Sequence, residues 1–248
     1  MPIILNACNW PQLGPEYLSG LKDAVAFVLS EFPSTVGIIA TGTIVRGNPG
    51  PSSDLDVCVI HTEKFRQRVQ RYSKGVPTEV FVNPPSEIER RFKGKESRPM
   101  TAHMLATGVV IAAVDPVVDL LRSKALELLR RRPVLPHDLI ARRYAVATVL
   151  EDALDVWQRD RPTARMILSQ AMEQMLKHAF LKASRFQPRM KDLLKESMAL
   201  DPSLGRLALR FYRSRSFRTQ LRMATLVADK ILGARGFFEW QSEKEPVE

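Results

Sequence analysis

Hydrophobic residues follow two different spacings along the first half of the chain. Residues 16–32 repeat apolar side chains every three or four positions and end at Pro33, which predicts an amphipathic helix. Short runs rich in β-branched residues predict buried strands at 36–41, 55–61, 78–83 and 109–112. Further helices are predicted over 63–72 and around 100–106. The fold class predicted here is α/β (α+β), with a small mixed sheet.

The pattern changes around residues 130–138, where Pro133 and Pro136 interrupt the chain and Asp138 can cap a new helix. From there to Gly233 the apolar spacing is helical almost throughout. Breaks are predicted near Arg161-Pro162, Gln187-Pro188 and Asp201-Pro202. The chain is therefore predicted to have two domains, a mixed-sheet domain over 1–132 and an all-α helical bundle over 133–248.

Composition narrows the class of protein. In 248 residues the hydrophobic share is 45% and the charged share 26%, which is typical of a globular protein. No apolar run approaches the roughly 18 residues needed to cross a bilayer, and no signal peptide precedes the first helix. Cys8 and Cys58 are the two cysteines, too few for a disulfide framework. These observations predict a cytoplasmic protein with no membrane contact.

Positive charge is concentrated in the second half. Residues 1–125 carry 14 Lys and Arg against 12 Asp and Glu, whereas residues 126–248 carry 23 against 15. Six arginines lie between 206 and 222 with no acidic residue among them. Such a run favours a polyanionic partner. A solvated helix face is the simpler interpretation of any single arginine and remains an equal alternative for the run of six. The six are Arg206, Arg210, Arg213, Arg215, Arg218 and Arg222.

Two aspartates open the second predicted strand. Because side chains alternate along a strand, Asp54 and Asp56 share one face while Leu55 and Val57 point into the core. Glu79 opens the next apolar strand, close enough to join them. Three converging carboxylates can hold one or two Mg²⁺ ions, and such a site suits deprotonation of a hydroxyl and transfer of a phosphorus centre.

The residues upstream suit phosphate binding. Gly42 follows the first strand and allows a sharp turn and close backbone approach to phosphate oxygens. Thr43 and Ser53 offer hydroxyl groups, and Arg46 offers a planar fork that fits phosphate oxygens.

This arrangement resembles the DNA polymerase beta nucleotidyltransferase superfamily. The shared pattern is a strand, Gly42-Thr43, ten residues, and then Asp54-Leu55-Asp56-Val57. Arg46-Gly47 and Ser53 match the GSxxRG…SDxD form of its small bacterial members, with Thr43 in place of the usual Gly or Ser. Segments 103–121 and 169–194 are similar, more weakly, to aminoglycoside nucleotidyltransferases and the helical domains attached to them.

The resemblance implies an enzyme, a nucleotidyltransferase with a two-metal Mg²⁺ site. It would transfer a nucleoside monophosphate from an NTP, by default AMP from ATP, to a hydroxyl acceptor and release pyrophosphate. Asp54 and Asp56 would ligate the metal, and Glu79 would be the third carboxylate and general base. The triphosphate would be bound by Gly42, Thr43, Arg46 and Ser53.

The acceptor stays open between RNA, a protein and a small molecule. A basic helical domain argues against a polycationic antibiotic and suits RNA or an acidic protein. A catalytically silent nucleotide-binding or interaction module, such as a toxin–antitoxin component, is the alternative, and a homodimer rests on analogy alone. An acidic helix segment (Glu151, Asp152 and Asp155) and Lys191 are further contact candidates, with ordinary surface roles as the simpler interpretation.

Overall fold

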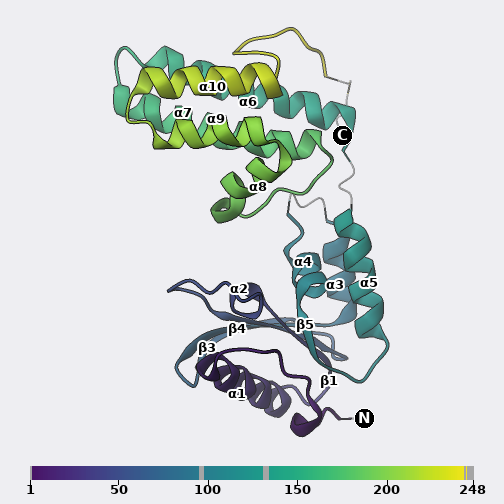
Figure 1. Cartoon of the computed structure of the whole chain (residues 1–248). Helices are drawn as coiled ribbons and strands as arrows, with labels where there is room; N and C mark the ends of the chain where they lie inside the picture. Colours follow the sequence, from purple (N-terminus) through teal and green to yellow (C-terminus); the bar gives the residue numbers. More distant parts are fainter. Residues whose placement is uncertain (1, 95–97, 131–133, 243, 245–248) are drawn as a thin grey trace. The chain divides into compact units, whose positions relative to one another are not determined.

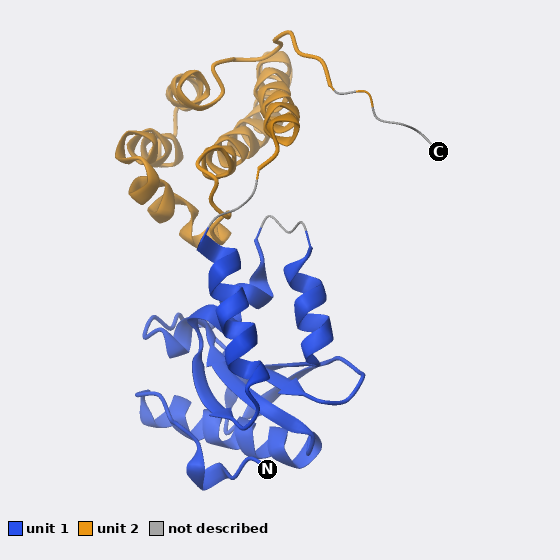
Figure 2. Cartoon of the chain, turned by 90° about the vertical axis from the view of Figure 1, so that its right-hand side faces the viewer, with its two compact units in different colours: residues 1–130 blue, residues 131–248 orange. Residues whose placement is uncertain are grey.

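In the computed structural model the chain forms two compact units, residues 1–130 (unit 1) and residues 131–248 (unit 2) (Figure 2). It describes residues 2–94, 98–130, 134–242 and 244. The domain boundary predicted after residue 132 lies at 131–133, outside the described residues. None of the described helices is long and apolar enough to cross a membrane.

Unit 1 is built on a mixed β-sheet with the strand order β3-β4-β2-β1-β5 (Figure 1). The strands β2 and β4 run parallel, and the other neighbours pair antiparallel. The strands are β1 (Thr35–Thr41), β2 (Leu55–His61), β3 (Gln67–Ser73), β4 (Val76–Asn83) and β5 (Val109–Ala113). The helices are α1 (Pro15–Glu31), α2 (Gly42–Val45), α3 (Pro85–Phe92), α4 (Met100–Thr107) and α5 (Val117–Arg130), and η1 (Leu5–Ala7) is a short 3₁₀ turn.

Helices cover both faces of this sheet (Figure 1). The face beneath α1 buries alternate residues of the central strand β2, namely Leu55, Val57 and Val59. The opposite face buries Cys58 and Ile60 beneath α3, α4 and α5. This two-sided burial explains the nearly continuous apolar run of β2, and it places Asp54 and Asp56 on the side of α3–α5.

The segment 63–72 was predicted as a helix, and that prediction is wrong. Residues Gln67–Ser73 form the edge strand β3, paired along its length with β4. Lys74 and Gly75 join the two strands, and both have positive φ angles, 51° and 85°, as a tight hairpin turn requires. Arg and Gln, which favour helices, are common in this segment. Their helix propensity is worth well under 1 kcal/mol per residue, so pairing with β4 overrides it.

In its described residues, unit 2 contains helices and connecting segments but no strand. Its helices are α6 (Pro136–Val156), α7 (Arg161–Lys182), α8 (Leu193–Leu200), α9 (Pro202–Arg213) and α10 (Phe217–Ile231), with the 3₁₀ turn η2 (Met190–Asp192) before α8. The pairs α6–α7, α7–α10 and α9–α10 pack around one apolar core. The three predicted breaks are present, and a fourth at residues 214–216 was missed.

Replacing Gly108 should destabilise unit 1. Gly108 ends α4 just before β5, and a Cβ atom there would lie 2.8 Å from the Met104 carbonyl oxygen and 2.9 Å from that of Ala40. Backbone atoms cannot move aside easily, so we expect Gly108→Ala to lower the free energy of unfolding by about 1–3 kcal/mol. Gly50→Ala, whose Cβ would meet nothing closer than 3.9 Å, is the control. Urea unfolding measures both, and equal stabilities would contradict the prediction.

Candidate functional site

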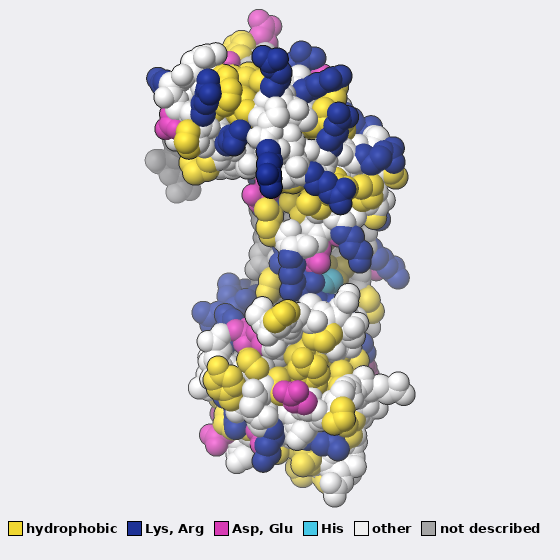
Figure 3. Space-filling view, turned by 60° about the vertical axis from the view of Figure 1, so that its left-hand side comes forward, with side chains coloured by type: hydrophobic (Ala, Val, Ile, Leu, Met, Phe, Trp, Pro, Cys, Tyr) yellow, Lys and Arg dark blue, Asp and Glu magenta, His cyan; other side chains and the backbone are white. Residues whose placement is uncertain are grey.

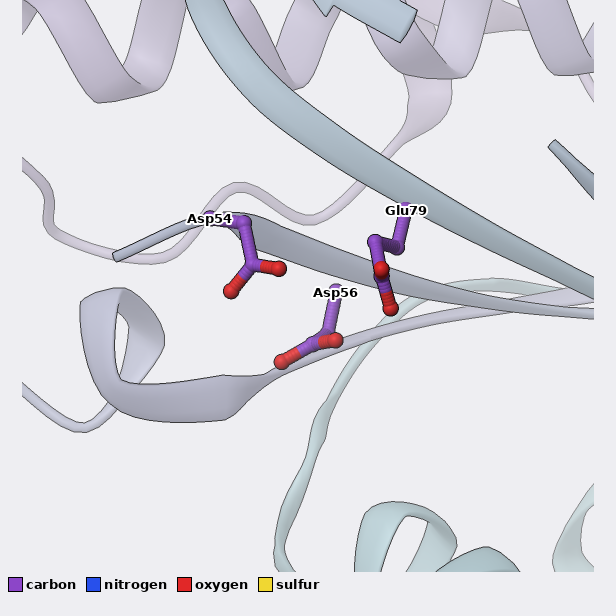
Figure 4. Close-up of side chains that lie close together, drawn as sticks. All are labelled: Asp54, Asp56 and Glu79. Carbon is purple, nitrogen blue, oxygen red and sulfur yellow. The ribbon is translucent and has the colours of Figure 1, made fainter. Parts of the chain in front are cut away.

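Three carboxylates converge at one end of the β2–β4 pair. One oxygen each from Asp54, Asp56 and Glu79 lies within 4.8 Å of the others (Figure 4). All three side chains are half-buried. Oxygen ligands at this separation are the kind that Mg²⁺ and similar hard cations prefer.

Strand register explains why the three groups meet. Asp56 pairs directly with Glu79 across the parallel β2–β4 ladder. Neighbouring parallel strands lie about 4.8 Å apart, and residues in register point to the same face. Asp54 lies two positions earlier than Asp56, so it shares that face as well. The convergence therefore follows from alternation and register alone.

The environment of Asp56 makes its carboxyl group harder to ionise. Burial raises its pKa to about 6, with additional contributions from the charges of Asp54 and Glu79. Arg46 and Arg68 act in the opposite direction and lower that pKa. A bound cation would favour the ionised form of this buried carboxyl and offset the repulsion from its two neighbours.

Gly42 is required where it stands. Its φ angle is 91°, a conformation that costs other residues energy. The Asp56 carboxylate also occupies the space that a Cβ atom on Gly42 would need. The turn that begins α2 therefore lies directly against the carboxylate cluster.

Hydrogen bonds close the loop between α2 and Asp54. The hydroxyl oxygens of Thr43 and Ser53 lie 2.9 Å apart, and the amide of Gly50 donates to the Ser53 hydroxyl over 2.8 Å. The Asn48 amide donates to the Thr43 carbonyl over 2.9 Å. These bonds bring the two predicted hydroxyl groups together, ten residues apart in the chain.

Two side chains that the sequence did not single out hold Glu79. Arg68 donates to one of its carboxylate oxygens over 2.6 Å, and Gln70 donates to the other. Both donors come from β3, where Gln70 pairs directly with Glu79. The sequence did offer one signal of a strand here. Polar Arg68 and Gln70 alternate with apolar Val69 ahead of a Lys-Gly turn, a pattern typical of a hairpin, but the segment was interpreted as a helix.

Other candidates lie outside this cluster, in unit 2. Glu151 packs against the backbone of Gly236, where a Cβ atom would lie 3.3 Å from its carboxylate oxygens. Asp152, Asp155 and Lys191 are exposed. The structure gives no ligand role to these residues.

Comparisons with known proteins concern the class of this domain and its fold. Residues 21–105 match the family model of the nucleotidyltransferase domain, so this part of the chain is a nucleotidyltransferase domain of the polymerase-beta-like type. No curated protein matches the chain. Among solved structures the chain is similar to a nucleotidyltransferase-like protein from Exiguobacterium sibiricum 255-15, with 15% identity and a TM-score of 0.51 over 85% of this chain and 73% of that one. A likeness at this identity concerns the fold.

The Asp56 carboxylate should destabilise the metal-free protein at neutral pH. In the unfolded chain the group ionises near its ordinary pKa of 3.8, and in the folded protein its pKa is about 6. The folded state thus binds the extra proton between these values, so stability falls as pH rises through this window. We expect Asp56→Asn to stabilise the metal-free protein at pH 8 and to have little effect at pH 4. Urea unfolding at both pH values tests this, with Glu31→Gln on exposed α1 surface as control. An equal gain at both pH values would rule out the charge as its cause.

Removing the charge of Arg68 should strengthen cation binding at the cluster. Arg68→Gln keeps a donor near Glu79 and removes a positive charge that competes with a metal ion. We expect the Kd for Mn²⁺ to fall severalfold, measured by Mn²⁺ paramagnetic resonance without nucleotide. Arg71→Gln, on the same strand but paired with Asp23 at 3.4 Å, is the matched control. A weaker or unchanged affinity in Arg68→Gln would contradict the expectation.

Proposed function

We propose that the protein is a nucleotidyltransferase that transfers a nucleoside monophosphate, AMP from ATP, to a hydroxyl acceptor and releases pyrophosphate. The observation that carries this proposal is the convergence of Asp54, Asp56 and Glu79 within 4.8 Å, inside a domain that matches the nucleotidyltransferase family.

The residues present fit a divalent cation. Asp54, Asp56 and Glu79 supply oxygen ligands alone, as Mg²⁺ requires. Burial, and then the charges of Asp54 and Glu79, raise the pKa of Asp56, so a cation bound there would stabilise its ionised form. Divalent ions bound there would stabilise the charge of the reacting phosphates and favour ionisation of the acceptor hydroxyl.

The protein's own groups would bind and orient the triphosphate. The turn at Gly42 lies against Asp56, so backbone amides of α2 and the Thr43 hydroxyl would reach phosphate oxygens next to the carboxylates. Ser53 would orient the Thr43 side chain through the contact between their hydroxyl groups. Arg46, whose charge acts on Asp56, would neutralise phosphate charge.

Glu79 would accept the proton of the acceptor hydroxyl. As that proton leaves, the acceptor oxygen bonds to the α-phosphorus, the bond from the α-phosphorus to its bridging oxygen breaks, and pyrophosphate departs. Arg68 and Gln70 each occupy one lone pair of a Glu79 oxygen. A carboxylate has about four such sites, so these two donors orient Glu79 and leave room for the proton.

Pyrophosphate release tests this function. Purified protein is incubated with Mg²⁺ and each of the four nucleoside triphosphates, with aminoglycosides, total tRNA or a protein extract as acceptor pools. We expect release that depends on one pool, is greatest with ATP, and falls by about 10²-fold or more in Asp56→Ala because a ligand of the reacting centre is lost.

The controls separate catalysis from binding. Asp119→Ala, on the exposed face of α5, should keep full release. ATP binding by wild-type protein without release in any pool would instead support a silent nucleotide-binding module. Release that persists unchanged in Asp56→Ala would contradict the assigned site.

A further inference from the structure

Helices α9 and α10 carry a run of arginines that the proposed reaction does not use. Between Pro202 and Ala228 there is no Asp, Glu or Lys, and all six positive charges come from exposed arginine side chains. We name this set the arginine face. It consists of Arg206, Arg210, Arg213, Arg215, Arg218 and Arg222.

The arginines lie on the solvent side of both helices. Arg206, Arg210 and Arg213 are spaced by four and three residues along α9, opposite its buried residues Leu204 and Ala208. Arg218 and Arg222 are spaced by four residues along α10. Arg215 lies in the turn between the helices, which pack against each other, so both rows belong to one helix pair.

Nearby acidic residues do not neutralise this charge. Asp201 and Asp229, the acidic residues that flank the run, pair with Lys230 at 3.0 Å and with Arg235 at 2.7 Å. Within the described part of the chain, none of the six arginines forms an ion pair. In Figure 3 positive side chains are spread over unit 2 with few negative ones between them.

The turn that presents Arg215 is held firmly. Phe217, the first residue of α10, stacks on Trp157 with ring centroids 3.5 Å apart and an interplanar angle of 2°. Arg165 of α7 donates to the Arg215 carbonyl over 2.9 Å, and Gln220 donates to that of Ser214 over 3.1 Å. The arginine face therefore rests on a fixed backbone, which lowers the entropy lost on binding.

We propose that the arginine face binds single-stranded RNA through its phosphate backbone. Arginine matches phosphate oxygens with two donors and stacks on bases, which lysine does not. On α9 and α10, all of whose residues are described, the exposed large apolar side chains are Tyr212 at 38% and Leu226 at 40%, whereas the centre of a protein–protein interface is usually apolar. A single strand can follow two helices and the turn between them, whereas a stiff DNA duplex contacts such a convex surface along one line.

Binding of a fluorescein-labelled 20-nucleotide RNA, measured by fluorescence anisotropy without nucleotide or Mg²⁺, tests the proposal independently of transferase activity. The test variant of the full chain is Arg210→Gln/Arg213→Gln/Arg218→Gln. We expect its affinity to fall about tenfold or more, and the slope of log K against log salt to fall by about 2, at about 0.7 per lost phosphate contact.

The matched control removes three positive charges of the same unit that already have acidic partners. It is Lys177→Gln/Arg189→Gln/Arg235→Gln, whose cations pair with Glu173, Asp192 and Asp229. We expect this control to bind RNA nearly as well as wild type. Equal loss in both triple variants would overturn the proposal, because net charge alone would then explain binding.

Two competitors separate RNA from other polyanions. Unlabelled RNA should displace the probe, while duplex DNA of equal length and polyglutamate should do so much less well. Displacement by polyglutamate at equal charge would overturn the proposal in favour of an acidic protein partner, and equal displacement by duplex DNA would overturn the assignment to RNA. Circular dichroism melts of both triple variants confirm that loss of binding is not loss of folding.

Discussion

Electrostatic repulsion among three carboxylates is the constraint around which unit 1 is arranged. Parallel pairing of β2 with β4 forces Asp56 beside Glu79, and alternation brings Asp54 to the same face. Burial, and then the charges of Asp54 and Glu79, make ionisation of Asp56 harder. The apolar burial of both faces of β2 supplies the stability that tolerates this crowding, since the fold as a whole must offset a locally unfavourable charge.

Two arginines from different parts of unit 1 partly relieve the repulsion among the carboxylates. Arg46 approaches from the segment after β1, and Arg68 from the edge strand β3. Arg68 is 59% exposed whereas Glu79 is 17% exposed, so the pair has one side open to solvent. A cation that enters this site would therefore meet carboxylates whose charge Arg46 and Arg68 only partly offset, and its binding would change the pairing of Arg68 with Glu79.

Much of unit 1 could be predicted from its residues because the decisive signals are local. The run Leu55–His61 is a strand, and Asp54, Asp56 and Glu79 do meet, as alternation and an adjacent third strand require. Arg68 and Gln70 were missed because their segment is polar and its alternation is weak. It becomes a strand through pairing with β4, and strand formation depends on such neighbours more than on the propensities of the segment itself. Helices α3 and α5 were not predicted, and the contacts of Glu151 with Gly236 depend on tertiary packing that a linear pattern does not contain.

The register of β2 and β4 also has a consequence for how this domain can change in evolution. Inserting one residue into β4 ahead of Glu79 would turn that side chain to the opposite face, so Glu79 would leave Asp56 for the core beneath α1. By contrast, the hydroxyl contact between Thr43 and Ser53 ties together the ends of a surface loop whose middle packs against little. Homologous proteins can therefore differ in the length and sequence of this loop, whereas β2 and β4 must keep the same number of residues.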